Sequence, residues 1–111
     1  MDRWPLLEGD EADTGVRTLL ELAPRGGAAL RAGSVRLAPG QRVPGEGTSA
    51  HAAEELSLIT HGSLRGESGG APFTVAAGEV TLIPAGEAHW AVAGEEGAEI
   101  FWVWFGDLGS G

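Results

Sequence analysis

Residues 99–105 read EIFWVWF, which is the strongest predicted strand in the chain. Successive side chains of a strand point to opposite sides, so every second residue shares a face. Both faces of this stretch are apolar, which predicts a strand that is buried on both sides. The two sets are Ile100, Trp102 and Trp104 on one face and Phe101, Val103 and Phe105 on the other.

Other short apolar stretches are separated from this strand and from one another by turn residues. The chain holds 19 glycines and 6 prolines, a density that disfavours long helices, and no segment keeps a helical period for more than two turns. The pair His61–Gly62 is interpreted as a turn between two strands. Many short strands with regular turns predict an all-β barrel or sandwich. The predicted strands cover residues 15–22, 30–37, 56–60, 73–75, 80–83 and 89–92, and another begins at Leu64.

The length sets the domain organisation. A chain of 111 residues corresponds to one domain, because domains hold roughly 100–150 residues. We expect a loosely ordered N-terminal lead-in over residues 1–14, a β-barrel over residues 15–106 and a C-terminal tail over residues 107–111.

Composition and charge exclude several classes of function. The net charge of −9 disfavours nucleic acid and anionic membrane surfaces as partners. The chain has no Cys, which excludes disulfides, thiolate zinc sites and cysteine nucleophiles. It has no Lys or Tyr, which excludes lysine Schiff bases and tyrosine general acids. No apolar stretch is long enough for a transmembrane helix or a signal peptide, and we expect a cytoplasmic protein.

Two stretches hold the residues that could bind a metal ion. The first, SAHAAEELSLITHG, covers residues 49–62, and the second, GEVTLIPAGEAH, covers residues 78–89. A lone histidine near a turn is more often a surface or core residue than a ligand. The two stretches together are more informative, because several of their residues fall at fixed spacings.

These spacings resemble the two conserved motifs of the cupin superfamily. The first motif reads His-x-His, three or four residues, Glu, six residues, Gly. Its positions fall here on Ser49, His51, Glu55 and Gly62. The second motif reads Gly, five residues, Pro-x-Gly, two residues, His, three residues, Asn. Its positions fall without a gap on Gly78, Pro84, Gly86, His89 and Ala93.

The resemblance implies a small single-domain β-barrel, built as a jelly-roll-like double sheet. It also implies a divalent metal held by the histidines and the glutamate of the motifs. Ser49 replaces the first histidine, and a neutral hydroxyl is a poor ligand for Zn²⁺ or Fe²⁺. The remaining set of His51, Glu55 and His89 suits Fe, Mn, Zn or Ni with open coordination positions.

Several other residues are candidates for this site or its surroundings. Glu46, between Gly45 and Gly47, becomes an extra ligand if a glycine bulge turns it inward. Ser49 is a second candidate polar group, because it shares a strand face with His51. His61 is expected to be exposed at its turn. Trp102 and Trp104 are expected either to line the pocket or only to pack the core.

Two functions remain open at this stage, besides a purely structural role. The first is a metal-dependent enzyme (isomerase, cyclase, lyase or dioxygenase) acting on a small, apolar or planar organic substrate, with Glu55 as ligand or general base. Arg42 and Arg65 are candidates for binding a substrate carboxylate, although solvated surface positions are expected for both. The second is a non-catalytic small-molecule-binding module with a degenerate metal site, which Ser49 and Ala93 favour. The two apolar faces of residues 99–105 predict a homodimer.

Overall fold

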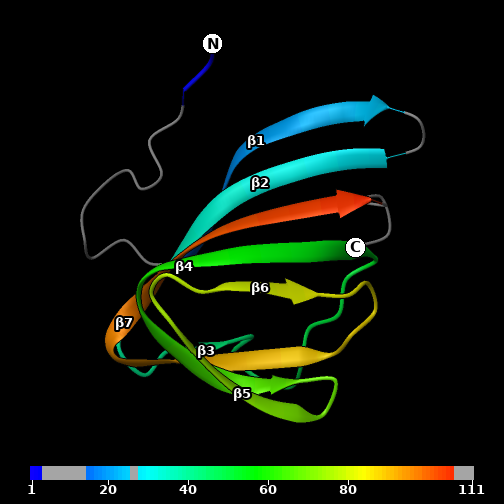
Figure 1. Ribbon diagram of the computed structural model, residues 1–111. Coiled ribbons are helices and arrows are strands. Elements are labelled where there is room, and N and C mark those ends of the chain that lie inside the picture. The colour runs from blue at the N-terminus through cyan, green and yellow to red at the C-terminus, as the bar shows by residue number, and fades with distance from the viewer. Residues whose placement is uncertain (4–14, 26–27, 107–111) are drawn as a thin grey trace.

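The structure, a computed structural model, describes residues 1–3, 15–25 and 28–106 (Figure 1). The predictions for residues 4–14 and 107–111 lie outside the described part. The strands are β1 (Gly15–Arg25), β2 (Ala28–Leu37), β3 (Arg42–Val43), β4 (Ala53–Ser68), β5 (Ala71–Ala76), β6 (Val80–Ile83) and β7 (His89–Gly106). This confirms the all-β prediction. Within the described residues, no helix is long and apolar enough to cross a membrane.

The strands pair antiparallel in the order β1-β2-β7-β4-β5, with β3 also paired to β7 and β6 to β4. β4 and β7 are the longest strands, and both bend so that each belongs to two layers (Figure 1). The first half of β4 pairs with β6 and with the end of β7, whereas its second half pairs with β5 and with the start of β7. The result is the expected jelly-roll double sheet. Among the described strands, β1 and β5 are not paired to close it.

The bend of β4 lies where the sequence predicted a turn between two strands. The pairing of β4 with β7 shifts register between Ile59 and His61 and again between Gly62 and Leu64. Gly62 has a φ of 74°, and a Cβ at this position would collide with the carbonyl oxygen of Gly97 on β7. Glycine therefore lets the two strands cross closely while both continue. The predicted turn at His61–Gly62 is wrong, because one bulged strand passes through it.

The core lies between the two layers. The inner face of β7 carries the predicted set of Ile100, Trp102 and Trp104. The outer face is less covered than predicted, because Phe105 is 39% exposed. The prediction of burial on both faces is therefore wrong at this residue. The buried residues of the core cluster are Val35, Leu37, Ile59, Leu64, Ala91, Ala93, Ala98, Ile100 and Trp102.

Candidate metal centre

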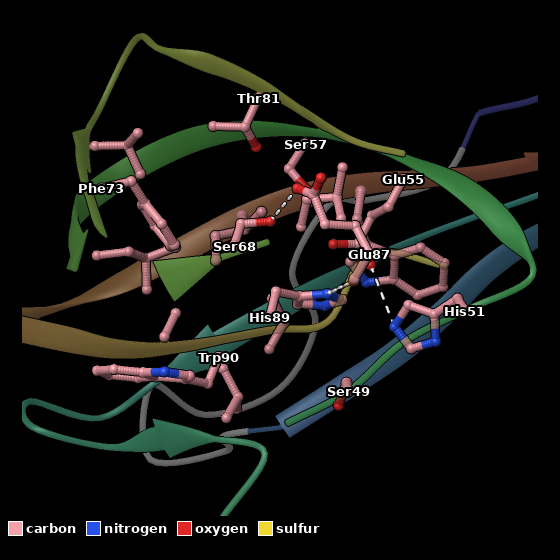
Figure 2. Close-up of a pocket in the computed structure, with 18 of the residues that line it drawn as sticks. Ser49, His51, Glu55, Ser57, Ser68, Phe73, Thr81, Glu87, His89 and Trp90 are labelled. Carbon is pink, nitrogen blue, oxygen red and sulfur yellow. Dashed lines mark hydrogen bonds and ion pairs between the residues drawn. The ribbon is translucent and has the colours of Figure 1, made fainter. Parts of the chain in front are cut away.

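His51, Glu55 and His89 meet at one wall of the space between the layers (Figure 2). His51 precedes β4, Glu55 lies near the start of β4, and His89 is the first residue of β7. All three side chains are half-buried, and one ligand atom from each lies within 4.8 Å of the other two. Strand pairing thus brings together residues that are up to 38 positions apart in the sequence.

Backbone hydrogen bonds hold the two motif segments together. The amide of Ser49 donates to the carbonyl of His89 at 2.9 Å, and the amide of His89 donates back to Ser49 at 2.9 Å. The amide of Gly86 donates to the carbonyl of His51 at 2.6 Å. Ser49 therefore fixes the relative position of the two histidines through its main chain.

Trp104 contacts two residues of the candidate centre. It pairs with Glu55 across the β4–β7 register, and its indole Nε1–H donates to Glu55 Oε1 at 2.6 Å. The ring of His51 packs on the same indole, with centroids 4.2 Å apart and an interplanar angle of 36°. Trp104 thus orients both a carboxylate and an imidazole, as outer partners of metal ligands do.

Burial favours the neutral form of His51, and a hydrogen bond orients the ring of His89. Burial lowers the pKa of His51, Glu55 raises it, and His89 lowers it further, with a net shift below the usual 6.5. His51 is therefore neutral at physiological pH. His89 Nδ1 lies 3.0 Å from the carbonyl oxygen of Glu87. A carbonyl only accepts, so this hydrogen bond requires the proton on Nδ1 and leaves Nε2 as the nitrogen with the free lone pair.

The donor set fits a divalent ion. Three ligand atoms bound to one ion at about 2.1 Å lie about 3.0–3.6 Å from one another. The three atoms here lie within 4.8 Å of one another, so side-chain adjustments bring them to one ion. Two imidazoles and one carboxylate leave coordination positions open toward the cavity.

The cavity beside the centre measures about 700 Å³, within the usual size of a small-molecule site. Trp102 and Trp104 both line it, with ring centroids 5.6 Å apart. Gly33 of β2 pairs with Trp102, and a Cβ there would collide with the indole. The missing side chain therefore lets this indole lie over β2. The remaining wall is mainly apolar and includes Leu37, Val43, Ile59, Leu64, Phe73, Val75 and Ile100.

Glu46 and His61 lie away from the candidate centre. Glu46 is exposed and does not line the cavity, so the structure does not bring it to the other ligands. His61 is exposed on β4, as expected. Ser49 does line the cavity. Neither Arg42 nor Arg65 lines it, and the Arg42 guanidinium lies 4.8 Å from the centroid of the Trp90 ring.

The sequence analysis missed several polar groups of the cavity wall. Ser57 follows Glu55 by two residues on β4, so strand alternation could have placed it inward. Glu87 also lines the cavity, but it lies in the turn before β7, where this alternation does not apply. Arg31 and Ser68 also line the cavity. Their positions depend on which strand pairs with which, and no local pattern indicates that.

Known structures share this architecture. A DMSP lyase, DddQ from Ruegeria pomeroyi DSS-3, matches with a TM-score of 0.66 and 25% identity over 74% of this chain. The chain spans only 41% of the length of that lyase. A protein of unknown function from Rhizobium leguminosarum matches with a TM-score of 0.67 and 22% identity over 94% of this chain and 95% of its own. KdgF from a Halomonas species matches with a TM-score of 0.57 and 18% identity over 76% of this chain and 84% of its own.

No protein of curated function matches the sequence. The family model Cupin_2, described as a cupin domain, matches residues 33–104, which is well over half of the chain. This range contains both motifs, all three residues of the candidate centre and both tryptophans of the cavity wall. The chain belongs to the Cupin_2 family of cupin domains.

Proposed function

We propose that this cupin is a metal-dependent enzyme that acts on a small, apolar or planar organic substrate. His51, Glu55 and His89 hold the ion, which is Fe, Mn, Zn or Ni. The observation that carries the proposal is the convergence of three ligand atoms within 4.8 Å on the wall of a 700 Å³ cavity. A divalent ion there supplies Lewis acidity or redox chemistry. The similarity to a lyase makes a lyase reaction the first type to test, beside isomerase, cyclase and dioxygenase reactions.

The chain's own residues prepare the site. Trp104 occupies one oxygen of Glu55, which leaves the other to ligate the ion or to accept a substrate proton. The carbonyl of Glu87 orients His89. The indoles of Trp102 and Trp104 offer flat apolar surfaces on which a planar substrate packs. The apolar remainder of the wall limits water, which strengthens electrostatic interactions inside.

The test is the metal content of the purified protein, measured per chain by elemental mass spectrometry. The proposal expects close to one equivalent of Fe, Mn, Ni or Zn. Less than about a tenth of an equivalent, unchanged after metals are added back, would refute it. That result would instead support a non-catalytic binding module, the alternative that Ser49 favours by replacing a histidine ligand.

A homodimer is the proposed assembly, and an apolar outer surface supports it. Leu56 and Leu58 of β4 pair with Leu82 and Val80 of β6, and these four side chains are 38–61% exposed. Contiguous exposed apolar side chains are unfavourable in water, and a second copy would cover them. Static light scattering should give twice the chain mass. A single-chain mass at micromolar concentration would refute the dimer.

A further inference from the structure

Glu87 carries a carboxylate on the cavity wall outside the three residues of the metal centre. It lies in the turn between β6 and β7, two residues before His89. It is half-buried and lines the same cavity (Figure 2). Its main-chain carbonyl orients His89, but the proposed function gives its side chain no part.

The side chain of Glu87 is held by the end of β4. Ser68 Oγ donates a hydrogen bond to Glu87 Oε2 at 2.6 Å (Figure 2). This distance is typical of a hydroxyl bound to an ionised carboxylate. The amide of Gly69 donates to the carbonyl of Ala88 at 2.9 Å, and a Cβ at Gly69 would come within 3.0 Å of the Glu87 carboxyl carbon. The close approach of this turn fixes the carboxylate in one place.

The hydrogen bond from Ser68 fills only part of the hydrogen-bonding capacity of the Glu87 carboxylate. An ionised carboxylate offers about four acceptor positions, and Ser68 fills one. A carboxylate on a mainly apolar wall is costly unless it gains further donors. Arg31 is the cavity arginine among the described residues, but it lies on β2, and its Nε is bound to Glu21 at 2.6 Å. Among the described residues, Ser68 is the side chain bound to this carboxylate, and its remaining acceptor positions are available to water or to a donor of a ligand.

The charges of the cavity point to the same class of ligand. The carboxylates of Glu55 and Glu87 both line the cavity, and the guanidinium of Arg31 there is paired with Glu21. A second anion beside Glu87 would be repelled, whereas a neutral or cationic donor would be attracted. The wall also includes the apolar side chains of Phe73 and Val75.

We infer that Glu87 and Ser68 form a second binding subsite of the cavity, which takes a hydrogen-bond donor of the ligand, a hydroxyl or an ammonium group. The ligand is then a small amphiphilic molecule with an apolar or planar body and a donor group bound by Glu87. The inference rests on the proposed function only for the role of the neighbouring metal centre.

The test compares three ligands that share a benzyl body: benzylammonium, benzyl alcohol and toluene. Their dissociation constants are measured by NMR titration at pH 7, on protein of measured metal content. At least one of the two donor ligands should bind about tenfold or more tightly than toluene, because hydrogen bonds to charged groups are worth that much. Benzylammonium and benzyl alcohol distinguish a preference for charge from a preference for a neutral donor.

Matched variants assign the preference to Glu87. Glu87→Gln should remove most of the donor preference and leave toluene binding unchanged. The control is Glu95→Gln, which removes the same charge from an exposed residue that does not line the cavity and should change nothing. Ser68→Ala should weaken donor binding by a smaller factor, because the carboxylate stays but loses its orientation. This variant keeps the test decisive if Glu87→Gln fails to fold.

Equal affinity for all three ligands would overturn the inference. So would the absence of binding by both donor ligands at about 5 mM, or an equal loss in Glu95→Gln. Its failure is distinguishable from failure of the proposed function. A full equivalent of metal without donor preference refutes the subsite alone. If the protein prefers the donor ligands but binds no metal, the proposed metal-dependent activity is refuted and the subsite stands.

Discussion

The two faces of β4 carry similar residues but have different roles. On β4, Glu55 accepts a hydrogen bond from Trp104 inside the cavity, whereas the adjacent Glu54 accepts one at 3.2 Å from the amide of Ala85 in an exposed contact. Ile59 is 1% exposed, but the adjacent Leu58 is 38% exposed. The comparison teaches that a residue's role here follows from its face, which the strand register sets.

The largest expected difference between the faces concerns metal binding. His89→Ala removes an inner histidine and should reduce bound metal to less than about a tenth of an equivalent, because two donors hold an ion poorly. His61→Ala removes the exposed histidine of β4 and should leave the metal content unchanged. Elemental mass spectrometry of both variants checks this. Equal losses would mean that the ligands are misassigned.

The next difference concerns packing of adjacent residues on β4. Ile59→Ala should lower the free energy of unfolding by about 2–5 kcal/mol, because it opens a cavity in the core. Leu58→Ala should cost less than about 1.5 kcal/mol in a dilute monomer, because that side chain is already partly in solvent. Urea denaturation of the two variants measures the gap. Similar losses would show that the outer face is as well covered as the core.

A third difference separates two indole–glutamate hydrogen bonds. Trp104→Phe keeps the aromatic packing on His51 but removes the donor to Glu55, and it should weaken metal affinity by about 10–100-fold. Trp90→Phe removes the 3.4 Å hydrogen bond to the exposed Glu67 and should leave metal affinity within about twofold. Competition titration with a chelator measures both affinities. Unchanged affinity in Trp104→Phe would show that Trp104 does not position the ligands.

The smallest expected effect is the pH dependence of the metal-free protein. Because the pKa of His51 is lowered in the folded state, the unfolded chain binds a proton more readily below pH 6.5. The contribution of His51 to stability is therefore complete above pH 6.5 and declines as the pH falls below it. Thermal unfolding between pH 7.5 and 5.5 should show a loss that is smaller in His51→Gln than in the parent protein. An identical slope in both proteins would contradict the assigned shift.

The prediction of the fold succeeded because its signals are local. Gly62 and Gly78 both have positive φ, and the motif spacings record these sharp changes of chain direction. The error at His61–Gly62 has the same origin. A glycine that bends a strand and a glycine that ends one look alike in sequence, and only the continued pairing with β7, beside the carbonyl of Gly97, separates them.

The candidate centre was partly predictable for a similar reason. The motif spacings identify His51, Glu55 and His89, which the structure brings within reach of one ion. Glu46 was proposed from a local glycine pattern, and the structure leaves it exposed. Glu87 was overlooked, because it lies in the turn before β7, where strand alternation does not apply.

The sequence alone indicated the all-β class, the cupin superfamily and the three residues of the candidate centre, because each depends on residue types at short, fixed spacings. Only the tertiary structure decided that Trp104 orients Glu55, that Ser68 holds Glu87 and that Arg31 reaches the cavity. Each of these contacts joins strands far apart in the chain. Their register depends on the packing of the whole double sheet, and no local pattern encodes it.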